Sequence, residues 1–343
     1  MNPSVVVAIP FFLASFFVTV SLVPLIIQFA YRYNIVDRPD GFLKMHEQAT
    51  PYLGGVAVFL GFFVAMLFIF FIVVPVDVPF VYTAVFSFMN MGMFGLLLLG
   101  LADDLYRFNA VIKWLWQIII VALFIIPPTL VFMTPAATVL YGIWALAVIN
   151  MFNLIDVMDG LATTVALCAV VALMVVRSGF WLIPDAAFAG ALAGFLWFNR
   201  PPARIYLGDA GSLLIGGFFA QAPLLFVANH YFATNRRLEF TQMFAQFVVP
   251  GFILLIPALE VFTLIVIRWR KGVPFYQGSH DHFAHYLLRK GWSKNTILGY
   301  VIALSLVLGT LSWLFTQGIL NLPMLLFCAT AFVAFWYTVL FFL

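Results

Sequence analysis

The chain has 343 residues, of which 65% are hydrophobic and 8% carry a charge. Its mean hydropathy is +1.12, whereas about a quarter of the residues in an ordinary soluble domain are charged. This composition excludes a water-soluble surface, and the net charge of +3 is too small to indicate nucleic-acid binding. The chain is therefore predicted to be a polytopic integral membrane protein, with residues 1–343 forming a single domain.

Apolar runs separated by polar clusters predict an all-α bundle of about eleven transmembrane helices, with ten as the alternative count. The first run is longer than a signal-peptide core and lacks a basic leader, so it is expected to be retained. The run at 186–198 is short, but its alanines and glycines would allow close packing between neighbours. The expected spans are 4–30, 53–75, 80–101, 111–126, 137–155, 160–177, 186–198, 211–228, 243–267, 296–315 and 324–342.

The basic residues of the loops predict the orientation. With the N-terminus outside, only Arg177, Arg236 and Arg237 of the 16 Lys and Arg residues fall on the outer side. The positive-inside rule makes the richer side cytoplasmic. That side carries Arg32, Arg38, Lys44, Arg107, Lys113, Arg200, Arg204, Arg268, Arg270, Lys271, Arg289, Lys290 and Lys294.

Carboxylates end several apolar runs on this same side. Asp103 and Asp104 follow the third run directly, and adjacent like charges repel one another unless a cation is present. A helix end that reaches water is the plain alternative for this pair. Asp209 lies between Gly208 and Gly211 near the start of a span, where the alternative is a helix N-cap.

Three polar residues recur at intervals of three at the end of the fifth run. On a helix or a helical turn, Asn153, Asp156 and Asp159 would share one side within apolar surroundings. Carboxylates at this depth are costly and are usually functional. The alternative is that they simply cap the next span.

Histidines gather in the last predicted cytoplasmic loop, at His280, His282 and His285. A metal cluster is one interpretation, but no companion cysteines are present, and phosphate contacts agree better with the neighbouring bases. A solvated interfacial loop is the alternative for each histidine. The oxygen donors ringed by bases suit Mg²⁺, which prefers one or two carboxylates plus substrate phosphates. Phosphoryl transfer at the membrane surface is therefore predicted.

In their order, these motifs resemble those of the polyprenyl-phosphate N-acetylhexosamine-1-phosphate transferases, a superfamily that includes the phospho-MurNAc-pentapeptide translocase. Val157 and Met158 depart from the usual glycine and aliphatic pair, and Ala284 stands where the family has a histidine. In this respect the chain resembles the polysaccharide-initiating branch more than the translocase. The matching stretches are Asp37 to Lys44, His46, Thr50 to Gly55, Asp103-Asp104, Lys113 to Gln117, Asn153 to Gly160, Leu207 to Ser212, and Pro257 to Glu260 leading into Arg268 and His282.

The resemblance implies transfer of a sugar-1-phosphate from a UDP-sugar to a polyprenyl phosphate lipid, with release of UMP. It implies an Mg²⁺ cofactor, which Mn²⁺ could replace, and a multi-pass protein of the inner (cytoplasmic) membrane that acts at the cytoplasmic face. Nucleic acid is not an expected partner, and the oligomeric state is left open, with a homodimer as one option. The first membrane step of envelope polysaccharide synthesis is the implied place of the reaction.

The resemblance also implies roles for single residues. Asp209 would hold Mg²⁺ together with Asp103 or Asp104, and the other of that pair would orient or deprotonate the lipid phosphate. His282 joins these three as a catalytic residue, and a proline kink near Pro257 and Glu260 would open the lipid groove. Substrate binding is expected at Lys44, Lys113, Asn153, Asp156, Asp159, Tyr206 and His285.

Two other functions also agree with parts of this pattern. Eleven spans with intramembrane carboxylates would also suit an ion-coupled transporter. A carrier needs its charges near the midplane of the membrane, whereas here they gather at one interface, which favours an enzyme. Within the family, the peptidoglycan MurNAc-pentapeptide translocase is the alternative.

Overall fold

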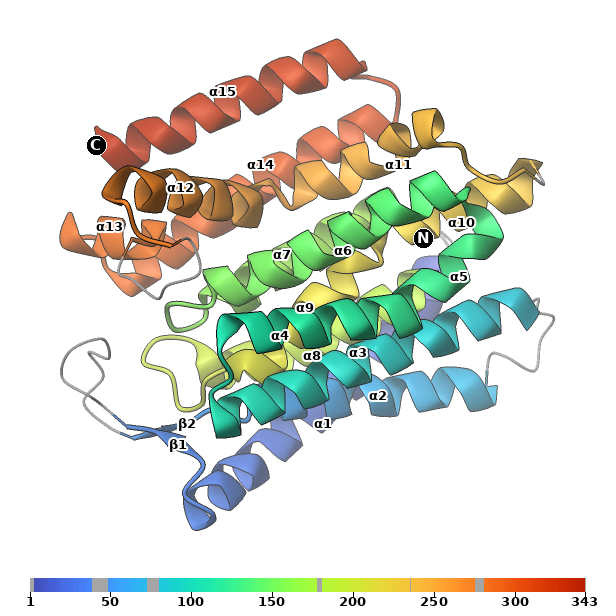
Figure 1. Cartoon of the computed structure of the whole chain (residues 1–343). Helices are drawn as coiled ribbons and strands as arrows, with labels where there is room; N and C mark the ends of the chain where they lie inside the picture. Colours follow the sequence, from blue (N-terminus) through green and yellow to red (C-terminus); the bar gives the residue numbers. More distant parts are fainter. Residues whose placement is uncertain are drawn as a thin grey trace.

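The computed structural model describes residues 3–38, 49–72, 80–177, 181–234, 236–274 and 281–342, which form a bundle of helices with one short hairpin (Figure 1). Helix α1 begins at the opposite end of the bundle from the hairpin (Figure 1). The helices are α1 (Pro3–Arg32), α2 (Gly54–Ile72), α3 (Phe80–Tyr106), α4 (Ala110–Ile120), α5 (Ile126–Phe132), α6 (Pro135–Ile155), α7 (Leu161–Val176), α8 (Leu182–Asn199), α9 (Gly208–Ala220), α10 (Ala222–Thr234), α11 (Phe240–Ile253), α12 (Leu255–Lys271), α13 (Phe283–Arg289), α14 (Lys294–Thr316) and α15 (Leu322–Phe341).

Within the described residues, each predicted span lies on one helix or on two consecutive helices, and the span at 111–126 covers α4 and the π-helical segment η1 (Val121–Ile125). Among the described residues, six helices are long and apolar enough to cross a membrane, or seven if a bent pair is one span. Three more apolar helices, at 54–68, 110–125 and 161–176, are shorter. The structure therefore confirms an all-helical, multi-pass architecture, while the count of about eleven spans stays a prediction.

The predicted span at 243–267 is broken into α11 and α12, which meet at an angle of 85°. Pro257 lies in the first turn of α12, and proline lacks the N–H that would continue the helical ladder back to Ile253. The helix therefore ends before this proline and restarts in a new direction. This bend directs α12 toward α13, so that the two helices lie together at one end of the bundle (Figure 1).

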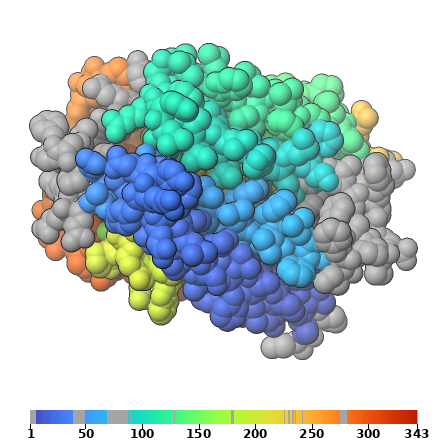
Figure 2. All heavy atoms as spheres, turned by 90° about the horizontal axis from the view of Figure 1, so that it is seen from below, coloured from blue at the N-terminus to red at the C-terminus, as the bar shows by residue number. Residues whose placement is uncertain are grey.

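Burial separates the central helix from the peripheral ones. In the segment Gly208–Ala228, 94% of the most apolar window is buried, against 28% for α1 and for α15. Figure 2 shows α1 lying across one face of the molecule beside α2. Helix α9 is therefore the centre of the bundle, and α1 and α15 are the helices that present most of their surface to lipid.

Glycines bring the backbones of α2, α3 and α9 into direct contact. A Cβ atom on Gly55 would lie 2.2 Å from the amide nitrogen of Gly211. A Cβ atom on Gly100 would lie 2.3 Å from the carbonyl oxygen of Asp209. Because larger side chains would force these helices apart, the glycines place the ends of α2 and α3 against the first turn of α9.

The hairpin pairs β1 (Val36–Asp37) with β2 (Thr50–Pro51) in antiparallel register. The loop before α9 runs beside this hairpin, because the Tyr206 N–H donates to the Pro51 carbonyl at 2.7 Å. In return the Gly54 N–H donates to the Tyr206 carbonyl at 3.0 Å. The starts of α2 and α9 are thereby held to one another.

Candidate active site

A cavity of about 930 Å³ opens at the end of the bundle where the hairpin lies. Its walls come from the chain segments that the charge pattern places on the cytoplasmic side. Ligand pockets commonly enclose about 300–1,000 Å³, so a nucleotide-sized molecule fits. The acidic residues that line it are Asp37, Asp103, Asp104, Asp156, Asp159 and Asp209.

The Lys113 ammonium joins two of these carboxylates. Its Nζ lies 2.8 Å from Asp103 Oδ2 and 2.8 Å from Asp209 Oδ1, and it donates to Asn153 Oδ1 at 3.2 Å. The Asn153 amide in turn donates to the Asp209 carboxylate and, at 3.0 Å, to Ser212 Oγ. Four helices, α3, α4, α6 and α9, therefore each bring a polar side chain to one point, while the roles expected for these residues stay predictions.

Asp103 and Asp104 are adjacent in sequence but contact different groups. Asp103 also accepts a hydrogen bond from the Phe108 N–H at 2.7 Å, which holds the loop after α3. Asp104 accepts the N–H of Asp209 at 2.9 Å on one oxygen and the N–H of Ala210 at 3.1 Å on the other. Asp103 thus contacts the ammonium, whereas Asp104 binds the backbone at the start of α9.

The loop between α6 and α7 carries the other two predicted carboxylates. Asp156 follows the last residue of α6, and Gly160 precedes α7 with a φ of +72°, a conformation that glycine adopts without strain. Burial raises the pKa of Asp156 to about 8, and the charges of Asp209, Asp104 and Asp159 add to the rise. Asp156 therefore holds a proton at neutral pH when no cation is bound.

Asp159 lies on the cavity wall and forms an ion pair that the sequence did not predict. Its Oδ2 lies 2.8 Å from Lys294 Nζ and accepts the N–H of Ala203 at 3.3 Å. Lys294 itself lines the cavity, although in the sequence it counted only as a charge that sets topology. Only the folded structure reveals this contact, because α14 begins at Lys294 next to the loop that carries Asp159.

Tyr206 also lines the cavity, and its role in substrate binding stays a prediction. Burial raises the pKa of its phenol, while a hydrogen bond with the Thr50 side chain opposes this rise. The Tyr206 hydroxyl is therefore held by a residue of β2, while its backbone lies in the loop before α9. Tyr52 and Arg107 line the same cavity and were not singled out from the sequence.

The histidines are positioned by α12 and α13. His282 Nδ1 lies 2.8 Å from Glu260 Oε1, and the Phe283 N–H donates to Glu260 Oε2 at 3.2 Å. The Glu260 side chain is fully buried, so His282 is its partner rather than water. His285 lines the cavity one turn further along, with its ring centroid 6.0 Å from that of His282. Sequence reasoning assigned Glu260 to the lipid groove and did not pair it with His282.

Three residues named from the sequence, Lys44, His46 and His280, lie outside the described residues. The role expected for Lys44 in binding phosphate therefore stays a prediction.

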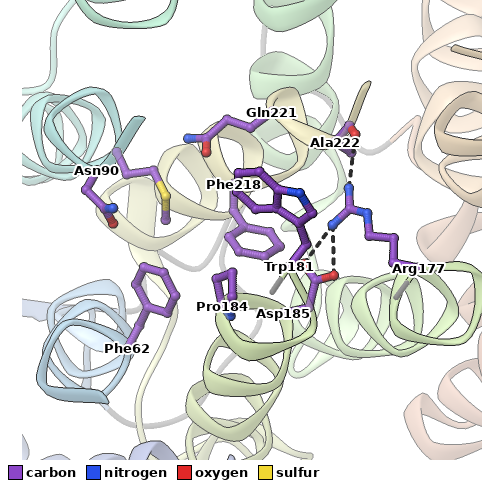
Figure 3. Close-up of a pocket in the computed structure, with 10 residues that line it drawn as sticks. Phe62, Asn90, Arg177, Trp181, Pro184, Asp185, Phe218, Gln221 and Ala222 are labelled. Carbon is purple, nitrogen blue, oxygen red and sulfur yellow. Dashed lines mark hydrogen bonds and ion pairs between the residues drawn. The ribbon is translucent and has the colours of Figure 1, made fainter. Parts of the chain in front are cut away.

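A second, small pocket of about 30 Å³ lies at the opposite ends of α7 and α8 (Figure 3). The Arg177 guanidinium there lies 2.8 Å from both oxygens of Asp185 and donates to the Ala222 carbonyl at 3.0 Å. The carbonyl belongs to the start of α10, next to the break after α9. The ion pair has no net charge, and the space would hold only a water-sized molecule. The role of the cluster is therefore to hold the ends of α7, α8 and α10 together through the contacts of Arg177.

The donor set can be compared with the needs of a magnesium ion. Among the described residues, no group of three or more His, Cys, Asp or Glu side chains encloses a metal position. Two carboxylates, of Asp103 and Asp209, nevertheless converge on one cation, the Lys113 ammonium. Mg²⁺ is usually held by one or two carboxylates together with substrate phosphates, so the residues fit that mode and not an all-protein cage.

The fold and the site define a helical membrane protein with an oxygen-rich, lysine-bridged cleft at one end. Residues 85–227 match the family described as Glycosyl transferase family 4. The chain is 26% identical to a probable undecaprenyl-phosphate N-acetylglucosaminyl 1-phosphate transferase of Bacillus subtilis, over 86% of this chain and 83% of that protein. It is 30% identical to the corresponding enzyme of Thermotoga maritima, over 58% of this chain and 59% of that protein.

A third relative belongs to the other branch of the superfamily. The chain is 27% identical to the phospho-N-acetylmuramoyl-pentapeptide-transferase of Thermobifida fusca, over 88% of this chain and 97% of that protein. The chain is therefore similar to both branches of the superfamily of polyprenyl-phosphate N-acetylhexosamine-1-phosphate transferases that its motifs resemble.

Proposed function

We propose that this protein transfers an N-acetylhexosamine-1-phosphate from a UDP-sugar to a polyprenyl phosphate, releasing UMP and forming a lipid-linked pyrophosphate sugar. The observation that carries the proposal is that Lys113 and Asn153 converge on Asp209, which lines an open cavity together with Asp103 at one end of a membrane bundle. A nucleotide donor can enter such a cleft from the aqueous side, while a lipid acceptor reaches it from the membrane.

The chemistry requires charge compensation more than a strong base. A phosphate monoester has a second pKa of about 6, so the lipid phosphate is largely dianionic at neutral pH. One of its oxygens attacks the phosphorus that carries the sugar, and the bond from that phosphorus to the UMP oxygen breaks. The Lys113 ammonium, held between two carboxylates, can shift toward the phosphates as they enter. When bound to Asp209 and Asp103, Mg²⁺ or Mn²⁺ would neutralise the charge that develops on the pyrophosphate.

The remaining residues of the cavity bind and orient the substrates. Tyr206 offers an aromatic face for the uracil, on the wall next to Asp209. The Asp159–Lys294 pair on the same cavity offers both an acceptor and a donor for the nucleoside. His285, on the cavity wall, supplies a ring nitrogen for the phosphates, while His282 is buried against Glu260 at the start of α13.

The choice between the two branches of the superfamily concerns the sugar. The first two relatives are named as N-acetylglucosaminyl 1-phosphate transferases and the third as a pentapeptide transferase. Ala284 interrupts the histidine run and favours the first branch. The rival class, an ion-coupled transporter, needs a charged pathway near the midplane, whereas the cleft lies at one end and the Arg177–Asp185 pair is closed on itself.

The proposal puts the cleft on the cytoplasmic side of the inner membrane, because the loops that line it carry most of the basic residues. UDP-sugars are then available on the side to which the cleft opens.

The test is an assay on the purified full-length protein with Mg²⁺, undecaprenyl phosphate and a panel of labelled UDP-sugars that includes UDP-MurNAc-pentapeptide. Lipid-extractable label and equimolar UMP are expected with one N-acetylhexosamine donor, and chelator should abolish both. Asp209→Asn should reduce turnover at least about a hundredfold, while Lys271→Met, at an exposed position outside the cleft, serves as the matched control. Absence of a lipid product with every sugar would refute the proposal.

A further inference from the structure

The first turn of α9 has no capping side chain of its own. The residue before the helix is Leu207, which makes no side-chain cap, although the first N–H groups of any helix have no partner within it. Two of these groups, the N–H of Asp209 and of Ala210, donate instead to the two oxygens of Asp104, at 2.9 and 3.1 Å. A carboxylate at this position also interacts favourably with the positive end of the helix dipole. Helix α9 is thus capped by a residue of α3.

The contact between α3 and α9 leaves no room for adjustment. A Cβ atom on Gly208 would lie 2.7 Å from Asp104 Oδ2 and 2.4 Å from the Tyr52 carbonyl oxygen. One turn earlier on α3, a Cβ atom on Gly100 would lie 2.3 Å from the Asp209 carbonyl oxygen. The Asp104 carboxylate therefore determines where α9 begins, and with it where the Asp209 side chain lies relative to Lys113.

We propose that Asp104 is a positioning residue, which caps α9 from α3 and so places the Asp209 carboxylate, while Asp103 and Asp209 contact the reacting groups and their cation. This assignment divides two adjacent aspartates by role and rests, for its kinetic part, on the function proposed above. It goes against the expectation that either of the two could hold the cation while the other orients or deprotonates the lipid phosphate. Both Asp104 oxygens are used by backbone amides, whereas Asp103 Oδ2 is bound to Lys113.

The two roles predict opposite orders of activity in a pair of substitutions. Asp104→Asn loses the charge but keeps one acceptor for the helix, so kcat should fall about tenfold, the worth of roughly one hydrogen bond. Asp104→Glu keeps the charge but adds a methylene where Gly208 leaves no space, and a displacement of about 1 Å can cost about a hundredfold. A ligand or a base at Asp104 would instead retain more activity as Glu than as Asn. Asp103→Asn and Asp103→Glu are the matched pair, in which the Glu variant should be the more active one.

A second measurement needs no turnover. Hydrogen exchange of the reconstituted protein should show the amides of Asp209 and Ala210 exchanging at least about tenfold faster in Asp104→Ala than in wild type. Asp103→Ala should leave these amides unchanged. If no UDP-sugar is turned over, the proposed function fails, but the exchange rates still decide the positioning role. Unchanged exchange in Asp104→Ala, or an Asp104→Glu variant more active than Asp104→Asn, would overturn the assignment.

Discussion

Removing the ammonium of Lys113 isolates the electrostatic role of the cleft. Lys113→Met keeps a flexible apolar stem but leaves Asp103 and Asp209, each 2.8 Å from the lost Nζ, facing one another without a cation. Removing one partner of a buried ion pair costs about 3–5 kcal/mol. The side chains of Lys113, Asp103 and Asp209 are 14%, 8% and 31% exposed, so a loss near the lower value, about 3 kcal/mol, is expected in chelator.

A divalent cation should replace part of the lost charge in this variant. At a concentration of 100 times its Kd, a ligand stabilises the folded state by about 2.7 kcal/mol. Saturating Mg²⁺ should therefore restore most of the stability of Lys113→Met. Wild type should gain less, because Lys113 competes for the same carboxylate oxygens.

The assay is unfolding of the detergent-solubilised protein, followed with and without Mg²⁺. Lys271→Met is the control outside the cleft: Lys271 is 53% exposed, although its partner Asp281 is 8% exposed, so losing this half-exposed pair should cost less than the loss at Lys113. Its stability should be insensitive to Mg²⁺. A Lys113→Met protein as stable as wild type in chelator, or an equal Mg²⁺ gain in both, would refute the electrostatic reasoning.

Two further substitutions test the packing and the protonation of the site. Gly100→Ala should destabilise the protein by about 1–3 kcal/mol, because the added Cβ has no room, and should impair activity by displacing Asp209, as measured by unfolding and turnover. The control Gly299→Ala, with nothing within 4 Å of the added Cβ, should be neutral or slightly stabilising. Equal effects of the two substitutions would contradict the packing argument. Because the pKa of Asp156 is raised to about 8 from 3.8, wild type should lose stability relative to Asp156→Asn as pH rises from about 4 to 8, by at least about 1 kcal/mol. Unfolding in chelator at pH 5 and pH 8 measures this, and a pH-independent difference would rule out the buried proton.

The positions of the helices could be predicted, because an apolar run must have a certain length to cross a membrane. The breaks were harder, since Pro257 alone predicts an interruption but not the 85° angle between α11 and α12. After the break α12 packs mainly against α6, and the buried contact of Glu260 with His282 ties it to the start of α13. The sequence showed both residues without the contact between them, since they are separated by 22 positions.

The membership of the site was largely predictable, but the division of labour within it was not. The spacing of Asn153 and Asp156 predicts that they share one side of a helix. Polar residues on one side of an apolar run are costly and usually functional. Nothing in the sequence separates Asp103 from Asp104, because the difference between them arises from the rotation of α3 against α9. Lys294 was also missed, because a basic residue at the end of a span is equally well explained by its effect on topology.

The close glycine contacts and the polar site are consequences of one arrangement. Gly55 and Gly100 remove the side chains that would separate α2 and α3 from α9, and only then can Asp104 reach the backbone of its neighbouring helix. Most spans of such a bundle tolerate small shifts, since lipid and apolar side chains adjust around them. The first turn of α9 does not, because the Asp209 carboxylate lies 2.8 Å from Lys113 and contacts Asn153 from a third helix. Changes of side-chain volume at the α2–α9 and α3–α9 contacts should therefore act on the chemistry of the cleft, even though the substituted residues touch no substrate.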